Sequence, residues 1–592
     1  TIYAFGIFAN DLKHALHLTQ LQLGAVSAAF FVAGLLSWLP GLVVDRQKPR
    51  FSMTLGGISG AVFTLTYWLL CRQPMLLASP LMTNYPISTL SVLALAICMS
   101  CGLIVGSVFK LTMLCGGRTG RGPAVGIAKG FVGLGSGVYA TIFQAFRKEA
   151  ESTLDFLPVI ATFFVICAAI PAYVLLPPRD QSHPHLMKIE TTPLHFHVMY
   201  ATLFVLCALI VTSALLDIYQ SQRENGGEQR QYFKIVMILI LWLGPIVSLL
   251  FLPRKGEDDD DDDGDAESKP IVPKTSATAM GNPSRRTGGL VSYGTSSISP
   301  SDENEGDYDD GEQNRTSLSK EVIDSWREIH KEEQLQGIPA TQQEDLPHSD
   351  PSNVVVDFKA NLSLPEMLQT TSAWLMLWTT VILVGSGTSK TNNMGEMVES
   401  LGFAEAVTPA TLAIFSVAQS AARIVTGIVS ESVLQTRQLP RPYFLVIASF
   451  VALVGHLALA ATTNSLVAFV AACTVCAIAF GMAWPLMVLI VGDIYGVEHH
   501  GANYMFYDGA TKALGTIFLS EILAGSVYES HVGLSEDTIH TSSRALSKRA
   551  ITCLGPECFQ KTHLITAALA VTGIVASLML CQTSKEAYGS KR

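Results

Sequence analysis

Four charged residues lie inside apolar stretches of the sequence that are long enough to cross a bilayer: Lys129, Arg423, Asp508 and Lys512. An ionised side chain in hydrocarbon is costly unless it faces a partner or a water-filled cavity, so these residues indicate a functional site. Lys512 lies roughly 16 Å along its predicted helix from Gly501, near the bilayer midplane, which makes it the first candidate for contact with an anionic substrate. The alternative is that Asp508, one helical turn earlier, neutralises it.

Lys129 and Asp508 occupy matching positions of an internal repeat. A shift of 379 residues places Gly122 on Gly501 and Lys129 on Asp508. The chain is therefore predicted to consist of two related halves, a plan typical of secondary transporters. Both charges should point towards the junction of the halves, where they pair with each other, with Arg423, or with a substrate or proton. A static salt bridge is the structural alternative.

A second matching pair places an acid at the end of an apolar helix in each half. Gly41-Leu-Val-Val-Asp45 corresponds to Gly427-Ile-Val-Ser-Glu431. An acid there can cap or pair with a helix end of the other bundle and hold the inner gate shut. We therefore expect gating roles for Asp45, Arg46 and Glu431, with solvated loop charges as the alternative.

Arg423 shares one helix face with Gly427 and Glu431, because the three residues are spaced four apart. It is predicted either to bind substrate or to form an internal ion pair with Glu431 or Asp508. Three further polar residues inside predicted helices are interpreted as structural: Lys110, which can snorkel to water, Glu521, which lies near the outer end of its helix, and His456. For His456 the alternative is a residue that titrates.

The segment Gly385–Asn393 ends a predicted helix with a run of hydroxyl and amide side chains. Polar helix ends interrupted by glycine commonly line cavities in transporters. A phosphate-binding loop is rejected, since the glycine before Lys390 is missing and no strand precedes the segment. The cavity candidates are Ser386, Thr388, Asn392 and Asn393, with exposure at the helix end as the alternative.

The elements that must position these residues are membrane helices. The sequence is 49% hydrophobic and 15% charged, whereas soluble domains contain roughly 25% charged residues. A membrane helix needs about 20 apolar residues. After a truncated helix at 1–8, candidates lie at 21–43, 52–71, 88–114, 123–144, 156–176, 197–217, 233–252, 370–389, 408–430, 443–461, 465–491, 503–527 and 562–581.

Between the two sets of helices the sequence is hydrophilic, rich in acid, Ser, Gly and Pro, and predicted to be disordered. Its aspartate run lacks the spaced ligands of a calcium-binding loop. Most of the net charge of −10 lies there, so no basic nucleic-acid-binding face is implied. The predicted organisation is a six-helix bundle at 1–178, two additional helices at 179–253, an acidic cytoplasmic loop at 254–361, and a second six-helix bundle at 362–592.

Lysine and arginine residues in the short loops place the acidic loop and both termini in the cytoplasm. On the opposite side, Cys553 and Cys558 lie in the loop before the last helix and could form a disulfide. Two CxxC spacings fall inside predicted helices, where packing is favoured over a metal or redox role: Cys98/Cys101 and Cys473/Cys476.

Several motifs, in order along the chain, carry a family resemblance. Gly41-Leu-Val-Val-Asp45-Arg46 resembles the loop signature of the major facilitator superfamily, although Gln47-Lys-Pro-Arg50 lacks its common glycine. The stretches that resemble the nodulin-like branch of that superfamily are Arg121-Gly122 through Lys129-Gly-Phe-Val-Gly-Leu134, Asn392-Asn393 with Glu399-Ser-Leu-Gly402, Arg423-x3-Gly427-x2-Ser430-Glu431, Asn503-Tyr504 through Gly525-x2-Tyr528-Glu529, and Cys553-x-Gly555-x2-Cys558-Phe559. The resemblance implies an all-α membrane protein with two six-helix bundles in pseudo-twofold repeat, working by alternating access, and it covers the two additional helices. It supplies no substrate beyond a distant similarity to monocarboxylate transporters.

The predicted function is secondary active transport of a small organic solute, an anion such as a carboxylate, because buried cations outnumber buried acids near the cavity. The chain shows no ATP site, so a proton, ion or solute gradient would drive transport. The alternative is a non-transporting membrane sensor or scaffold that signals through the acidic loop. The signatures of an intramembrane enzyme are missing from the sequence. No cofactor or metal is predicted; the expected partners are the lipid bilayer and the solute. The membrane of residence and the partners of the loop are left open.

Overall fold

The computed structural model of the protein describes residues 11–12, 15–16, 18, 20–115, 117–146, 152–176, 193–220, 236, 240, 361–404, 407–462, 465–536 and 553–588. Within these residues every regular element is a helix, as predicted. Three predictions fall outside them: the truncated helix at 1–8, nearly all of the additional helix at 233–252, and the acidic loop up to residue 360.

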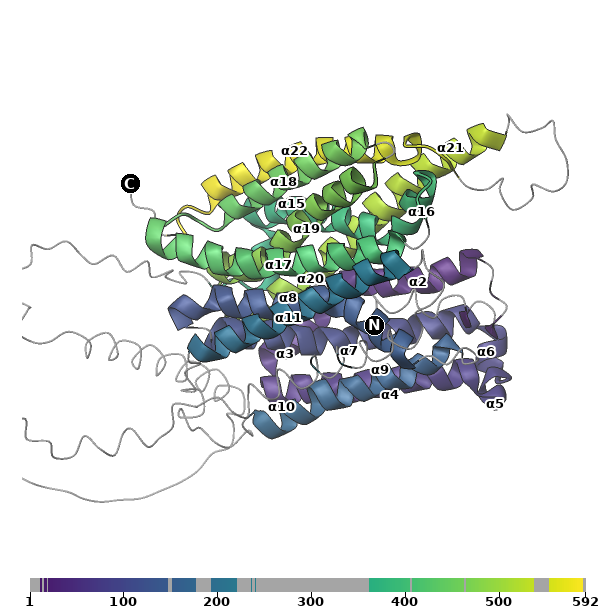
Figure 1. Ribbon diagram of the computed structural model, residues 1–592. Helices are drawn as coiled ribbons and strands as arrows, with labels where there is room; N and C mark the ends of the chain where they lie inside the picture. The colour runs from purple at the N-terminus through teal and green to yellow at the C-terminus, as the bar shows by residue number, and fades with distance from the viewer. Residues whose placement is uncertain are drawn as a thin grey trace, which may run out of the picture. The chain divides into compact units, whose positions relative to one another are not determined.

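The N-terminal half consists of helices that follow one another through short turns (Figure 1). They are α2 (Gln20–Leu35), α3 (Trp38–Arg46), α4 (Pro49–Arg72), α5 (Pro74–Leu77), α6 (Pro80–Asn84), α7 (Pro86–Cys115), α8 (Gly117–Phe146), η2 (Thr153–Phe156), α9 (Leu157–Phe164), η3 (Val165–Ala169) and α10 (Ile170–Leu175). The first additional helix is α11 (Pro193–Gln220).

The C-terminal half begins with a short helix whose N-terminus carries a capping box, in which Ser363 and Glu366 satisfy each other's backbone N–H groups. Its elements are α14 (Leu364–Leu368), α15 (Thr371–Asn392), α16 (Met394–Ser400), α17 (Val407–Arg437), α18 (Pro442–Ala461), α19 (Leu466–Tyr495), α20 (His500–Gly515), η6 (Thr516–Gly525), α21 (Ser526–Glu536) and α22 (Glu557–Thr583). The segments η3 and η6 are π-helical and continue their neighbours, so 500–531 forms one span.

The predicted helix at 21–43 is broken into α2 and α3, whose axes bend by 49°. Pro40 accounts for the break, because it has no N–H to donate to the carbonyl of Leu36 and its ring crowds that carbonyl. The bend is followed by a contact between α3 and α20, a helix of the C-terminal half.

Nine of the described helices are long and apolar enough to cross a membrane, and the bent pair α2/α3 would be a tenth. The helices α8 and α15 do not meet that hydropathy test, although their 30 and 22 residues are long enough. Both carry many glycine and polar residues, and most of α15 is buried among its neighbours. Such a composition is tolerated in a bilayer when the polar face turns towards other helices. The candidate residues Lys129 and Ser386 lie on these two interior helices.

Glycine residues bring the two halves into backbone contact at two crossings. A Cβ added to Gly427 in α17 would lie 2.4 Å from the carbonyl oxygen of Gly122 in α8, and one added to Gly41 would lie 2.5 Å from the carbonyl oxygen of Gly501 in α20. Any side chain at these positions would push the helices apart. Figure 1 shows α8 and α17 running side by side as a consequence.

Candidate functional site

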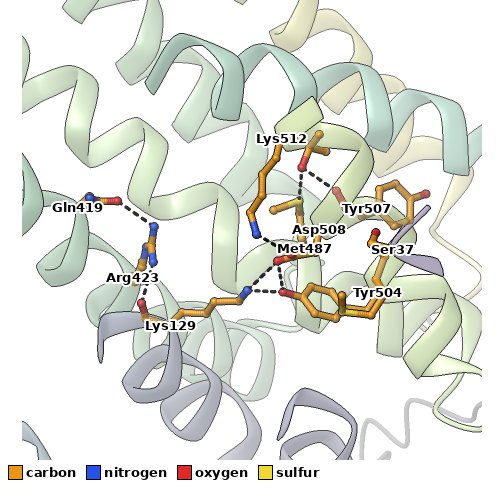
Figure 2. Close-up of polar contacts among 11 residues, drawn as sticks. Ser37, Lys129, Gln419, Arg423, Met487, Tyr504, Tyr507, Asp508 and Lys512 are labelled. Carbon is orange, nitrogen blue, oxygen red and sulfur yellow. Dashed lines mark hydrogen bonds and ion pairs between the residues drawn. The ribbon is translucent and has the colours of Figure 1, made fainter. Parts of the chain in front are cut away.

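A carboxylate shared by two lysines lies where α8 meets α20 (Figure 2). The Asp508 Oδ1 atom is 3.3 Å from Lys129 Nζ, and Oδ2 accepts a hydrogen bond of 2.6 Å from Lys512 Nζ. The Tyr504 hydroxyl donates to Asp508 Oδ1 at 2.6 Å and accepts from Lys129. Lys129 is 2% exposed, whereas 30% of the Lys512 side chain is exposed, so Lys512 is the more accessible of the two ammonium groups.

Aromatic rings surround the Lys129 ammonium. Its Nζ lies 4.1 Å from the ring centroid of Phe109, 4.9 Å from that of Tyr504 and 5.0 Å from that of Trp484. The Lys512 ammonium lies over the same Trp484 ring at 4.9 Å. Cation–π contacts of this kind hold ammonium groups in a desolvated site with less cost than bare hydrocarbon.

Arg423 approaches the same indole from α17, with its guanidinium carbon 5.4 Å from the Trp484 ring centroid. It donates hydrogen bonds of 2.8 Å to the carbonyl oxygen of Lys129 and to Gln419 Oε1 (Figure 2). Glu431, one of the two acids named as an alternative partner of Arg423, forms an ion pair with Arg441. We define the junction cluster as Lys129, Arg423, Trp484, Tyr504, Asp508 and Lys512.

The junction cluster contains three cationic side chains and a single carboxylate. Lys129 and Lys512 pair with that carboxylate, whereas Arg423 lies over the Trp484 ring. The indole Nε1–H of Trp484 has no hydrogen-bond partner among the described residues although Trp484 is 2% exposed. A buried donor without an acceptor is unfavourable, and donors and cations gathered around one site favour an anion.

The predicted gate residue Asp45 binds the first turn of α20. Its carboxylate accepts hydrogen bonds of 2.8 Å from the backbone N–H of Gly501 and 2.7 Å from that of Ala502. Lys110 adds an ion pair at 2.8 Å, so it does not simply snorkel to water as predicted. The partial positive charge of a helix N-terminus strengthens such contacts. Arg46 is exposed and forms no hydrogen bond or ion pair with the described residues.

Glu431, the acid that corresponds to Asp45 in the repeat, lies in the C-terminal half and contacts a helix of the N-terminal half. It accepts a hydrogen bond of 2.8 Å from the backbone N–H of Gly122, in the second turn of α8. The Arg441 guanidinium pairs with Glu431 at 2.7 Å and with Asp493. Burial alone would lower the pKa of Arg441, but the carboxylates of Asp493 and Glu431 outweigh it and raise that pKa above its usual value. Each half thus places an acid on backbone N–H groups of the other half, Asp45 in the first turn of α20 and Glu431 in the second turn of α8.

The polar end of α15 contacts η6 and its own helix. Asn392 and Asn393 each donate to Ser520 Oγ at 3.2 Å, and Thr388 accepts from the Thr516 hydroxyl at 3.3 Å. Ser386 donates to the carbonyl oxygen of Leu383 at 2.9 Å. Thr388, Asn392 and Asn393 therefore join α15 to η6 within the C-terminal half, and these hydrogen bonds do not reach the junction cluster.

Cys553 forms a disulfide with Cys558, which lies in the first turn of α22. The cysteines of both CxxC spacings carry free thiols, and no group of His, Cys, Asp and Glu residues in the described part of the chain has the arrangement of a metal site. Sequence reasoning missed Trp484 and Tyr504. Tyr504 had a local signal, since it lies one turn before Asp508, whereas nothing local distinguishes Trp484 within the apolar helix α19.

Several known proteins are similar to this chain in sequence or in structure. The Nodulin-like family profile matches residues 1–249. No curated protein matches the sequence. Among solved structures, the chain is similar to the proton:xylose symporter XylE bound to 6-bromo-6-deoxy-D-glucose, with a TM-score of 0.47 at 10% identity over 98% of this chain and 91% of that one. It is also similar to FucP, a Major Facilitator Superfamily transporter in the outward conformation, with a TM-score of 0.39 at 11% identity over 98% and 96% of the two chains. The E. coli fucose:proton symporter FucP gives 0.38 at 11% identity over 98% and 96%. The chain therefore carries a Nodulin-like region at residues 1–249 within a multi-pass integral membrane protein.

Proposed function

We propose that the protein is a secondary active transporter that moves a small organic anion, such as a carboxylate, by alternating access. The observation that carries the proposal is the junction cluster between the two halves, in which Lys129 and Lys512 share the Asp508 carboxylate. The Arg423 guanidinium lies over the ring of Trp484, whose N–H has no hydrogen-bond partner in the described part of the chain. Lys512 is the partly exposed member and would meet the solute first. A carboxylate would then accept hydrogen bonds from Lys512 and Trp484 while Asp508 keeps Lys129 charged.

The gate contacts supply the second element of alternating access. Asp45 and Glu431 each bind backbone N–H groups of the opposite half, beside the two glycine crossings. These contacts hold one end of the junction shut. Their release would let the halves separate at that end and expose the junction cluster to the other side, as expected when a transporter alternates around a fixed site.

Uptake into proteoliposomes tests the proposal. The purified full chain is reconstituted and supplied with labelled monocarboxylates, amino acids, sugars and organic cations, with and without an imposed pH gradient and a protonophore. We expect uptake of a carboxylate, and a stimulation by the gradient if protons are coupled. Lys512→Met should raise the half-saturating solute concentration by about tenfold or more, the effect of losing one charged hydrogen bond.

The control variant is Lys585→Met, which removes an equally charged but exposed lysine outside the junction. Uptake of cations or sugars alone, or an unchanged affinity in Lys512→Met, would contradict the anion assignment. A chain without flux towards any solute, whose cellular output is lost on deletion of residues 262–350, would instead support the sensor alternative. A transporter should keep its flux after that deletion.

A further inference from the structure

A second group of buried basic side chains lies in the C-terminal half, on three helices that contribute nothing to the junction cluster. Lys390 in α15, His456 in α18 and His563 in α22 are 1%, 0% and 3% exposed. The two imidazole ring centroids are 5.8 Å apart. Lys390 interacts electrostatically with both rings. We name these three residues the basic cluster.

The basic cluster has no counter-charge within the described residues. Lys390 forms no ion pair or hydrogen bond there, and the other titratable groups that it interacts with are the thiols of Cys473 and Cys476 in α19. A thiol is uncharged in an apolar interior and cannot neutralise an ammonium. Both ring nitrogens of His456 and the Nδ1 atom of His563 also have no hydrogen-bond partner in the described structure.

Burying these three side chains without a counter-charge or hydrogen-bond partners is energetically unfavourable, so a bound ligand is expected beside them. A buried ammonium without a carboxylate is among the least favourable arrangements in a membrane interior, and unpaired buried imidazoles add to that cost. An ammonium beside two imidazoles offers N–H donors and positive charge, which is the chemistry that holds an anion. A metal cation would be repelled by Lys390. We propose that the basic cluster binds a small monovalent anion of the size of chloride or formate.

The surroundings favour a small ion over an organic solute. Gly455 in α18 packs so closely on α19 that an added Cβ would lie 2.7 Å from Cys476 Sγ. On the other side, Phe559 stacks on His563 with ring centroids 6.4 Å apart, and Tyr528 lies 5.5 Å from Phe559. The hydroxyl of Tyr528 accepts a hydrogen bond from the backbone N–H of the disulfide residue Cys553 at 3.2 Å.

This row of rings connects the basic cluster to the disulfide segment before α22. The same segment is held to α16, because the N–H of Gly555 donates to the carbonyl oxygen of Ser400 at 2.7 Å. Tight packing of Gly455 on α19 favours an ion of a few atoms over a larger organic solute. The bound anion would stabilise the C-terminal half and is distinct from the solute of the junction cluster.

Thermal unfolding of the purified full chain in lipid nanodiscs tests the proposal. The unfolding midpoint is measured in sodium chloride, bromide, nitrate or formate, each against sodium gluconate at constant ionic strength. We expect a saturable rise of about 5 °C for the wild type at saturating chloride. Lys390→Met should show no rise, and in gluconate it should be at least as stable as the wild type, because it removes a buried charge that then has no partner.

Two control variants each remove a lysine elsewhere in the chain and leave the basic cluster unchanged. Lys512→Met in the junction cluster and Lys585→Met on an exposed turn should both retain the full chloride response. Loss of the response in Lys512→Met would place the ion at the junction instead and overturn the proposal. So would a wild type that does not respond to any of the four anions, or a Lys390→Met protein that still responds.

A structural role of Lys390 would give a different pattern. Lys390→Met would then be destabilised equally in chloride and in gluconate, which contradicts the proposal. If that variant does not fold, His563→Phe keeps the lysine and removes one donor. Its half-saturating chloride concentration should rise about tenfold, as expected for one lost hydrogen bond to a charged group. An unchanged half-saturating concentration would overturn the assignment.

Discussion

Asp45→Asn should shift the protein away from the conformation in which α3 is held against α20. The substitution preserves the shape of the side chain and removes its charge. Asp45 accepts three hydrogen bonds in the structure, from the backbone N–H groups of Gly501 and Ala502 and from Lys110. An amide has a single acceptor oxygen, so at least one backbone bond and the ion pair are lost.

The magnitude follows from those losses. A hydrogen bond to a charged group contributes about 1.5–3 kcal/mol, and the Asp45 carboxylate is only 5% exposed, so solvent replaces little of what is removed. A total loss of about 3 kcal/mol corresponds to roughly a 150-fold fall in the ratio of closed to open molecules. If the wild type favours the closed state over the open state by less than about 3 kcal/mol, the closed state becomes the minor state in Asp45→Asn.

Distance measurements between two spin labels detect this shift. Arg46, after the gate acid, and Glu498, before α20, are both exposed, so labels at these positions leave the contact intact. The free cysteines are replaced and the disulfide pair is kept. We expect one short distance for the wild-type gate and a second, longer population in Asp45→Asn. The exposed acid Glu586 provides the matched control, and Glu586→Gln should leave the distribution unchanged.

Two outcomes would refute the reasoning. An unchanged distance distribution in Asp45→Asn would show that the glycine crossings alone hold this end closed. An equal shift in Glu586→Gln would show that net charge, and not the contact with α20, controls the equilibrium. Glu431→Gln should reproduce the effect from the other half, since it loses its bond to Gly122 and its ion pair with Arg441.

Three further predictions concern packing, the disulfide and a cap. Gly427→Ala should also raise the open population, because the new Cβ would lie 2.4 Å from the Gly122 carbonyl oxygen; the same labels measure it, and Gly395→Ala, which meets nothing within 4 Å, is the control. Replacement of Cys553 and Cys558 by Ser should lower the free energy of unfolding by about 2 kcal/mol, the entropy of closing so short a ring, and a reductant should lower the wild-type unfolding midpoint equally. The hydroxyl and the N–H of Ser363 hold the pKa of Glu366 below its usual 4.5. The stabilisation from that cap is therefore present above pH 4.5 and is lost as the pH falls through the lower folded-state value. Hydrogen exchange in α14 should rise in Glu366→Ala and not in Glu396→Ala, and protection that persists in Glu366→Ala would exclude the cap as its source.

The sequence drew attention to residues of the junction cluster and of the gate contacts, but it did not predict all the partners of those residues. Residue type, a repeat offset and helical spacing are local properties, and they were enough to relate Lys129 to Asp508 and Asp45 to Glu431. The partners of these residues depend on how far each helix is rotated about its axis. Apolar membrane helices carry little amphipathic signal to set that rotation, because lipid-facing and buried faces are both apolar.

Lys110 and Trp484 show that tertiary contacts between helices were not visible in the sequence. Lys110 was interpreted as a snorkelling lysine because nothing in its own helix shows that Asp45 lies 2.8 Å away. Trp484 belongs to an apolar stretch of α19 and joins the junction cluster only through tertiary packing. The break between α2 and α3 was missed as well, because 21–43 was predicted as one helix although Pro40 within it is a local cause of a bend. The predicted roles of the site residues, and the orientation in the membrane, stay predictions.

The same two helices carry the gate contacts and the ion pair, which gives a physical route from solute to gate. Gly122 and Lys129 lie about 10 Å apart along α8, and Gly501 and Asp508 lie the same distance apart along α20. An anion that attracts Lys512 and Lys129 weakens their hold on Asp508 and so weakens the link between α8 and α20. Because Asp45 and Glu431 bind the starts of those helices, any relative movement of α8 and α20 changes both gate contacts together. A solute with no differential affinity for the two arrangements would change neither. Coupling is therefore expected only for solutes that compete with Asp508 for the lysines, and addition of a neutral analogue should not open the gate.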